Sequence, residues 1–270
     1  MDAIARNSVA NVRIEPNQRS GLHSQVLLGE SVGVLEEKVP WFRCRLEDGS
    51  IGWIHSGSLT LDPDIAGSYR TGELLCARAL QARCLEEPNP ASRTLAILTD
   101  GSRLLSSERQ DKWQRVILPD GHSGWIPAGI ATLIENLPSP SPESIRGLAL
   151  DYVGIPYLWG GTSTLAFDCS GYVQLIYRLH RTILPRNSYE QGEMGEAVEP
   201  GEGWGRLIAG DLLFFAEGER IDHVAVSLGG ASVAHASISN GRVAVESLEP
   251  GEDNYSARMA GLFRCAHRLF

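Results

Sequence analysis

The sequence lacks any hydrophobic run of the kind that directs a chain to a membrane. Residues 1–20 hold no apolar stretch of seven or more after a basic start, and no window of 18 apolar residues occurs later. Secretory signals and membrane-spanning helices both need such runs. We therefore expect a cytoplasmic protein without membrane insertion, or an exported one if a leader was removed.

Positive charge is also scarce. The 24 lysines and arginines are outnumbered by 33 aspartates and glutamates, the net charge is −9, and no basic run occurs. Nucleic acids and anionic membranes are bound through clustered basic side chains. The composition therefore excludes both as expected partners. The hydrophobic content of 43% over 270 residues suffices for several domains of ordinary size, and the oligomeric state stays open.

Cysteine occurs only five times and in no paired motif. An odd count without a Cys-x-x-Cys pair argues against a disulfide framework and suits a reducing compartment. No His-x3-His pair occurs either, so we predict no metal and no other cofactor, with a scattered zinc site as the weaker alternative. Four of the cysteines we interpret as core or surface thiols: Cys44, Cys76, Cys84 and Cys265.

The fifth cysteine, Cys169, directly precedes an amphipathic run. Apolar residues recur at intervals of three and four from Val173 to His180, which predicts a helix over 170–180 with Cys169 at its positive end. A helix N-terminus lowers the pKa of a thiol, and the thiolate is the attacking species. Cys169 is therefore a candidate nucleophile. A buried structural thiol is the alternative, and for cysteines in general it is the commoner role.

Two histidines flank a predicted hairpin. His223 begins a strand-like segment that returns to His235, and alternation places them on one face only if the loop is odd. A three-residue loop, Leu228 to Gly230, would set His223 directly opposite His235. We predict that His223 is the general base and that His235 orients it.

Five motifs surround these residues in a fixed order: YLWGG at 157–161, FDCSGYV at 167–173, PRNSYEQ at 185–191, GDLLFF at 210–215 and HVAV at 223–226. Together they resemble the NlpC-type papain-like cell-wall peptidases over roughly residues 142–270. The resemblance implies an α+β papain-like domain that cleaves γ-D-glutamyl to diamino acid bonds in peptidoglycan peptides. It implies Cys169 as nucleophile, His223 as base and His235 as third member.

The same resemblance assigns further residues. Tyr157 falls where the family keeps a tyrosine near the reacting carbonyl, so it is a candidate donor to the oxyanion, beside the backbone N–H of Cys169. Plain core packing is its alternative role. Asp211 we interpret as a fold residue. The residues that resemble the lining of the substrate groove are Trp159, Asp168, Ser170, Arg186 and Ser188.

The remainder of the chain is a duplication. Residues 41–54 recur as 113–126 at a constant offset of 72, each copy with an Asp-Gly turn followed by a Gly-Trp-Ile strand. Both copies resemble bacterial SH3-like domains. We therefore predict a multidomain chain of two small SH3-like β-barrels and an α+β papain-like peptidase, with Ser141 capping the first peptidase helix and Pro142 at its first position. The predicted boundaries are 1–62, 63–136, a Pro/Ser linker at 137–143, and 144–270.

Paired SH3-like domains without a signal resemble the recycling endopeptidases, which trim muropeptides that have a free N-terminal L-alanine. By that resemblance Glu15 would hold the amine, with an exposed loop carboxylate as the alternative. Ser50 stands where many relatives have tyrosine, and Asn187 where many have aspartate. Both differences remove a polar or charged contact to an ammonium group. An exported hydrolase of broader specificity and a non-catalytic wall-peptide-binding protein stay open, as does the choice of diaminopimelate or lysine.

Overall fold

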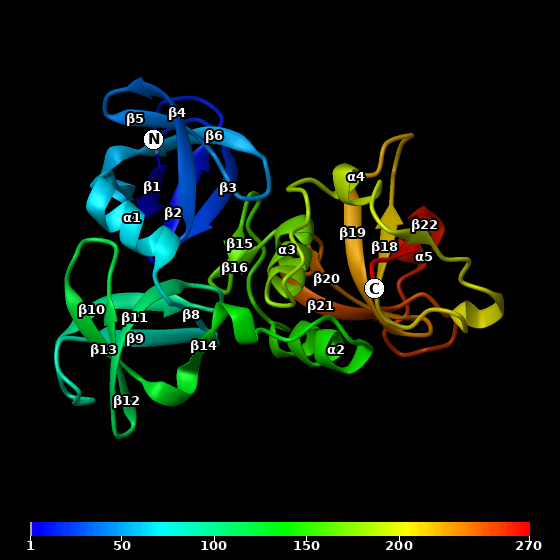
Figure 1. The fold of residues 1–270 in the computed structure, drawn as a ribbon. Coiled ribbons are helices and arrows are strands. Elements are labelled where there is room, and N and C mark those ends of the chain that lie inside the picture. The colour runs from blue at the N-terminus through cyan, green and yellow to red at the C-terminus, as the bar shows by residue number, and fades with distance from the viewer. Residues whose placement is uncertain (1) are drawn as a thin grey trace. The chain divides into compact units, whose positions relative to one another are not determined.

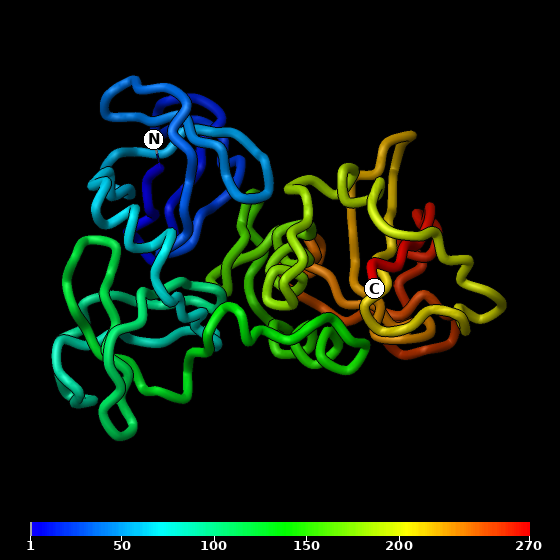
Figure 2. Tube along the Cα trace, viewed as in Figure 1, coloured from blue at the N-terminus to red at the C-terminus, as the bar shows by residue number. Residues whose placement is uncertain are grey.

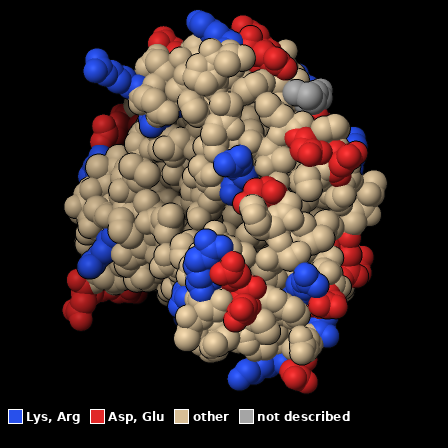
Figure 3. All heavy atoms as spheres, turned by 90° about the vertical axis from the view of Figure 1, so that its left-hand side faces the viewer, with Lys and Arg blue, Asp and Glu red and all other residues tan. Residues whose placement is uncertain are grey.

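The computed structural model describes residues 2–270, and the chain divides into two compact units (Figure 1). The first ends at Leu137 and the second begins at Pro138. Over the described residues, no helix has both the length and the apolar character needed to cross a bilayer. On the face shown in Figure 3, acidic and basic side chains form small mixed groups on a largely uncharged surface, with no extended basic patch.

The first unit contains two seven-stranded sheets of the same design. The first has the order β3-β2-β6-β5-β4-β1-β7 and the second β10-β9-β13-β12-β11-β8-β14, so every strand corresponds to the one seven places later. In Figure 2 the first sheet belongs to the blue part of the chain and the second to the cyan and green part that follows. The strands of the first sheet are β1 Asp2–Ala5, β2 Val9–Arg13, β3 Leu22–Leu27, β4 Ser31–Lys38, β5 Trp41–Arg45, β6 Ile51–His55 and β7 Leu59–Thr60. Those of the second are β8 Leu74–Ala77, β9 Gln81–Leu85, β10 Thr94–Thr99, β11 Arg103–Gln110, β12 Trp113–Ile117, β13 Ser123–Pro127 and β14 Ala131–Leu133.

The repeated Asp-Gly pair closes the same hairpin in both sheets. Gly49 and Gly121 have φ of 83° and 85°, a region that glycine enters without steric cost. The carboxylates of Asp48 and Asp120 accept hydrogen bonds from the backbone N–H two residues later, at 2.9 and 3.1 Å. The sequence repeat is therefore a repeat of tertiary structure, because the same turn chemistry recurs in each copy.

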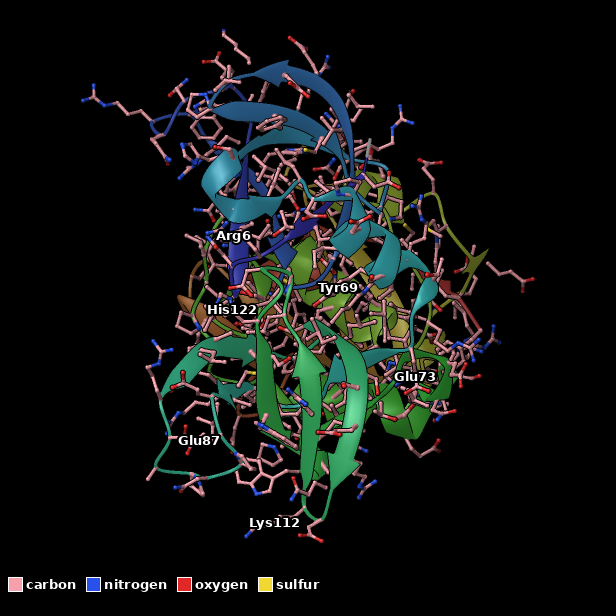
Figure 4. The ribbon with its side chains drawn as sticks, turned by 60° about the vertical axis from the view of Figure 1, so that its left-hand side comes forward. Arg6, Tyr69, Glu73, Glu87, Lys112 and His122 are labelled. Carbon is pink, nitrogen blue, oxygen red and sulfur yellow. The ribbon has the colours of Figure 1, made fainter. Side chains whose placement is uncertain are left out.

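The segment between the two sheets forms a helix that the sequence analysis did not predict. α1, Pro63–Thr71, begins after Asp62, whose carboxylate accepts from the backbone N–H of Asp64 at 2.8 Å. Tyr69 is buried on this helix, and its hydroxyl donates to the carbonyl of Ile117 in the second sheet at 2.8 Å. Figure 4 shows Tyr69 turned inward, whereas Lys112 lies at the tip of a hairpin. The mixed polar composition of the segment concealed its one buried face.

The second unit is an α+β domain built on one large sheet. Its helix α2, Pro142–Asp151, begins as predicted, since Ser141 accepts from the backbone N–H of Ser144 and Pro142 is the first helical residue. The main sheet has the order β17-β22-β18-β19-β20-β21. Its strands are β17 Glu196–Ala197, β18 Ala209–Phe215, β19 His223–Gly229, β20 Ser232–Ser237, β21 Arg242–Ser247 and β22 Phe263–Arg268, and the other elements are β15 Thr162–Ser163, β16 Ala166–Phe167, α3 Cys169–Arg178, α4 Ser188–Gln191 and α5 Ala257–Leu262.

Helix α3 packs against β19 and β20, which brings the Cys169 segment to the strands that carry the two histidines (Figure 1). Eight of its ten residues are buried, so the helix is a core element of the unit. On the neighbouring strand β18, Asp211 is fully buried and accepts from the Arg268 guanidinium at 2.7 and 2.8 Å. Asp211 is thus a fold residue that joins β18 to β22, as its sequence context indicated.

Candidate active site

Cys169 is the first residue of α3, so the sequence located the helix start within one residue. Asp168 is the N-cap, and its carboxylate accepts from the backbone N–H of Gly171 at 2.7 Å. An aspartate at this position stabilises a helix by satisfying an otherwise unpaired N–H and by complementing the positive helix end. The cap therefore fixes the thiol at the point where the chain turns into the helix.

Asp168 also forms a buried ion pair with Arg186. The two guanidinium nitrogens lie 3.0 and 2.5 Å from the carboxylate oxygens, and the same oxygens accept from the N–H of Gly160 and the hydroxyl of Ser170. Arg186 donates in turn to the Ser170 hydroxyl at 2.8 Å. Asp168 and Arg186 are only 6% and 3% exposed. Their charged groups are thus directed at each other, and they link the Tyr157 motif, the Cys169 helix and the segment before α4.

The two histidines form a hydrogen bond. Nε2 of His223 lies 2.8 Å from Nδ1 of His235, and the rings are nearly perpendicular. The predicted hairpin loop is wrong in detail. Val226 pairs with Ala234 and Ser227 with Val233, a register that places Ala225, not His223, opposite His235. A bulge between Ser227 and Gly229 absorbs the odd residue, so both histidines still project from one face.

Glu246 extends this pair. It belongs to β21, and its Oε2 lies 3.3 Å from Nε2 of His235, while its other oxygen accepts from Asn240 at 2.8 Å. Since Nε2 of His223 is used by His235, Nδ1 is the ring nitrogen left to accept another proton. His223 then carries its proton on Nε2 and His235 on Nε2, facing Glu246, because a neutral imidazole has one donor and one acceptor. The carboxylate thus favours the tautomer that leaves Nδ1 of His223 unprotonated.

The lowered thiol pKa expected from the helix terminus is not found. Burial raises the pKa of Cys169 to about 12, with the Asp168 carboxylate adding to the shift. The backbone N–H groups of Val224 and Ser170 and the Arg186 guanidinium act in the opposite direction without offsetting it. Burial thus favours the neutral thiol over the thiolate. A backbone hydrogen bond joins Cys169 to Val224, the residue that follows His223.

His223 is shifted toward the neutral form as well. Burial lowers its pKa to about 3, and the charges of His235 and Arg258 add to this effect, while Glu246 opposes it. A neutral imidazole beside a neutral thiol can accept the proton at the moment of attack, since the two charges then created attract each other. The predicted roles of Cys169 as nucleophile and His223 as base therefore do not require a permanent ion pair.

Tyr157 lies within the electrostatic reach of Cys169. Burial raises the pKa of its phenol, and the negative forms of Cys169 and Asp168 raise it further. The hydroxyl therefore stays protonated at neutral pH, as a hydrogen-bond donor must. Its backbone is fixed by an N–H bond to the carbonyl of Gly241 and a bridge to Phe167. Tyr157 is thus close enough to Cys169 for their charges to interact, and its role as a donor to the oxyanion stays a prediction.

A pocket of about 520 Å³ opens beside the two histidines. Trp159 forms part of its wall and is 70% exposed, which is unusual for a tryptophan and leaves its ring available to a ligand. The pocket is lined by Trp159, Phe215, Glu217, Asp222, His223, His235, Ser237, Ile238, Ser239, Glu246, Ser256, Arg258, Met259 and Leu262. The cluster of Asp168, Ser170 and Arg186 is not part of this wall.

The remaining predicted site residues have varied settings. Ser188 is buried at the start of α4, and Asn187 precedes it with its amide donating to Glu190 at 2.8 Å and to the Tyr189 hydroxyl at 3.2 Å. Glu15 is exposed in the β2–β3 loop, and the Ser50 hydroxyl donates to Asp48 at 2.5 Å. Glu15 and Ser50 belong to the first unit, so their part in the site stays a prediction.

Several residues of the site were not found from sequence. Glu246, Glu217 and Arg258 come from a strand, a loop and a short helix that carry no recognisable motif. Only the strand register and the packing of α5 bring them to the histidines. Within residues 2–270, no three His, Cys, Asp or Glu side chains converge in the manner of metal ligands.

The comparisons with known proteins agree with this geometry. Residues 154–260 match the NlpC/P60 family, and residues 12–59 match the bacterial dipeptidyl-peptidase SH3 domain. Residues 154–260 are an NlpC/P60 domain. The NlpC/P60 domain and its SH3 neighbour define a cell-wall peptidase of the cysteine hydrolase type. The second sheet of the first unit has the strand order of the first, but its assignment as another SH3-like domain stays a prediction, as do the domain boundaries.

The chain is similar over most of its length to two curated relatives. It is 29% identical to a gamma-D-glutamyl-L-lysine dipeptidyl-peptidase of Bacillus cereus, over 79% of this chain and 67% of the relative. It is 28% identical to dipeptidyl-peptidase 6 of Lysinibacillus sphaericus over the whole of both chains. The crystal structure of an NlpC/P60 family protein from Bacillus cereus superposes with a TM-score of 0.87 at 23% identity, covering 99% of each chain, which shows a shared fold.

The lowered pKa of His223 predicts the acid limb of the pH profile. We predict that His223 acts as a base only when it is neutral, so kcat/KM is expected to stay level as pH falls through 6.5, the ordinary histidine value, and to decline only toward about 3. Between pH 6.5 and about 3 the unfolded chain binds a proton at His223 that the folded chain does not. The free energy of unfolding therefore decreases as the pH is lowered through this window. Glu246, with its pKa lowered to about 2, adds stability that is lost below its ordinary 4.5.

The measurement is kcat/KM between pH 4 and 8, with circular dichroism at each pH to separate loss of fold from loss of base. A decline centred at pH 6.5 in folded protein would show that His223 titrates as an unperturbed imidazole.

Proposed function

We propose that this protein is a cysteine endopeptidase that hydrolyses the γ-D-glutamyl-L-diamino acid bond of peptidoglycan-derived peptides. The single observation that carries the proposal is the His223–His235 hydrogen bond, formed beside a cysteine at the start of a buried helix. A nucleophile, a base and a group that orients the base are the elements of covalent acyl transfer.

The proposed reaction runs in two steps. His223 accepts the thiol proton as Sγ of Cys169 attacks the γ-carbonyl carbon, and the oxyanion receives hydrogen bonds from Tyr157 and from the backbone N–H of Cys169. When the C–N bond breaks, the imidazolium returns the proton to the leaving amine. Water, deprotonated by His223, then attacks the thioester, the acid product leaves and the thiol is restored. His235 and Glu246 hold the base in its working tautomer.

The nature of the bond is supported by two relatives. Proteins similar to this chain in Bacillus cereus and Bacillus subtilis are named for the γ-D-glutamyl-L-lysine bond, the latter at 37% identity over 46% of this chain and 40% of that relative. The diamino acid proposed here is lysine or diaminopimelate. Trp159, Ser170 and Ser188 remain our candidates for contacts to the peptide, whereas Asp168 and Arg186 act mainly by holding the Cys169 helix.

A role in recycling is part of the proposal. It requires a free N-terminal L-alanine, for which Glu15 is the proposed acceptor of the ammonium group, and it takes place in the cytoplasm. Asn187 already donates to Glu190, so Asn187→Asp alone would set two carboxylates side by side. Three variants are therefore informative: the double variant Asn187→Asp with Glu190→Gln, the single variant Ser50→Tyr and the single variant Glu15→Ala. The double variant and Ser50→Tyr should raise selectivity for the free amine, and Glu15→Ala should lower it.

The test is turnover of L-Ala-γ-D-Glu-L-lysine and its diaminopimelate analogue, each beside the N-acetylated form. We expect cleavage at the γ-glutamyl bond, with the free-amine peptide preferred by about 5- to 150-fold if a charge-assisted contact worth about 1–3 kcal/mol holds the ammonium. Equal cleavage of both forms would support the second candidate, a hydrolase of broader specificity. Absence of cleavage in every peptide would leave a wall-peptide-binding protein as the better account.

A chelator and a thiol reagent serve as controls on the chemistry. Activity should persist in EDTA and disappear after alkylation of Cys169, since the thiol attacks the carbonyl. The opposite pair of results would favour the zinc alternative.

A further inference from the structure

The pocket beside the histidines has an unusual distribution of charge. Three carboxylates line it, from Glu217, Asp222 and Glu246, against the single guanidinium of Arg258. Two of the carboxylates are occupied within the fold, because Asp222 accepts from the backbone N–H of Glu217 at 3.2 Å and Glu246 holds Asn240 and contacts His235. The third, Glu217, forms a direct ion pair with Arg258, and both residues line the pocket.

The ion pair between Glu217 and Arg258 is exposed enough for a charged ligand to replace one of its partners. Both side chains are 63% exposed, so water can reach them and a ligand can displace one partner from the other. Their segments are anchored. Arg264 donates to the carbonyl of Ala216 at 2.9 Å at the base of the Glu217 loop, and Arg258 also donates to the hydroxyl of Ser239 at 3.3 Å. The pocket therefore presents one cation and one anion from anchored segments.

The pocket lies on the leaving-group side of the reaction. In the proposed mechanism His223 gives its proton to the departing amine, so the amine and the residue that bears it must lie on the imidazole side. The wall of the pocket includes both imidazoles, while Cys169, Tyr157, Asp168, Ser170 and Arg186 lie outside it, on the other side of His223 in the proposed mechanism. The segment that occupies the pocket is then the residue released from the γ-glutamyl group.

We propose that Arg258 and Glu217 form the subsite for the leaving diamino acid and bind its two charged groups. Arg258 takes the free carboxylate, and Glu217, released from Arg258, takes the side-chain ammonium, so one internal ion pair is replaced by two with the ligand. The Arg258 guanidinium and the Glu217 carboxylate together match the free carboxylate and the side-chain ammonium of lysine. Diaminopimelate carries a second carboxylate next to its ammonium, which would meet Glu217 and is disfavoured. The inference rests on the proposed function and names the substrate class of the same site.

The experiment compares kcat/KM for three peptides that differ only in the leaving group: L-Ala-γ-D-Glu joined to lysine, to lysine amide or to diaminopimelate. In the wild type we expect lysine to exceed lysine amide and diaminopimelate by about 10-fold each, since partly exposed charge pairs contribute modestly. Arg258→Gln should bring the lysine to amide ratio close to one, and Arg258→Lys should keep part of it. Glu217→Gln should reduce the lysine to diaminopimelate ratio.

Two matched controls separate the subsite from general charge effects. Arg242→Gln and Glu219→Gln remove equivalent exposed charges that do not line the pocket, and both should keep the wild-type ratios. If the ratios are the same in Arg258→Gln, Glu217→Gln and the wild type while cleavage itself proceeds, the subsite is wrong and the proposed function stands. If the wild type cleaves none of the peptides, both proposals fall together. Circular dichroism of each variant confirms that the fold is unchanged.

Discussion

Replacing Cys169 by alanine is expected to abolish hydrolysis while leaving the protein folded. The proposed mechanism has no other nucleophile, and the substitution removes one buried sulfur without disturbing the Asp168 cap, which bonds to Gly171 and not to the thiol. His223→Ala should cost on the order of 10² to 10⁴ in rate, since general-base work is lost. His235→Ala should cost less, because water can partly replace an orienting group. Turnover of the γ-glutamyl peptide at saturating concentration measures all three.

The matched control is Cys265→Ala, a partly exposed free thiol in β22. It should retain wild-type turnover, and alkylation of this variant should still inactivate it. More than a few per cent of activity in purified Cys169→Ala would mean that the nucleophile is misassigned. Melting curves of each variant distinguish loss of catalysis in a folded protein from loss of the fold.

The largest expected effect on stability comes from Asp168→Ala. The change removes the carboxylate that accepts two guanidinium bonds from Arg186, and Arg186 is 3% exposed, so its charge cannot be solvated by water. Breaking a buried pair from one side typically costs about 3–5 kcal/mol, and loss of an N-cap about 1 kcal/mol more. The midpoint of denaturant unfolding of the second unit, monitored by near-ultraviolet circular dichroism, should fall accordingly.

Two further variants test the cause of that loss. Asp168→Asn keeps an acceptor for the Gly171 N–H and should be less damaging than alanine, although the ion pair with Arg186 is still lost. Glu36→Ala removes an exposed partner of Arg43, 3.7 Å away, and should change stability by no more than about 0.5 kcal/mol. Equal effects of Asp168→Ala and Glu36→Ala would contradict the assigned role of the buried pair.

Local chemistry explains what could be predicted. The Ser141 cap, the start of the Cys169 helix and the repeated Asp-Gly turns each depend on residues within four positions of one another, so the sequence specifies them directly. The order of the site motifs was equally informative, since it predicted an NlpC-type domain. The α1 helix was missed because its buried face is defined by contacts such as that of Tyr69 with the second sheet.

The sequence by itself determined that a cysteine begins a helix and that two histidines lie on the two strands of one hairpin. It also determined that the first half of the chain contains two copies of one repeat. Only the tertiary structure decided how these parts work together. The bulge after Ser227 sets the face of the histidines, and burial raises the pKa of Cys169 where the helix terminus alone would lower it. Glu246, Arg258 and Glu217 reach the site through packing between distant segments, which depends on the whole fold and leaves no local pattern in the chain.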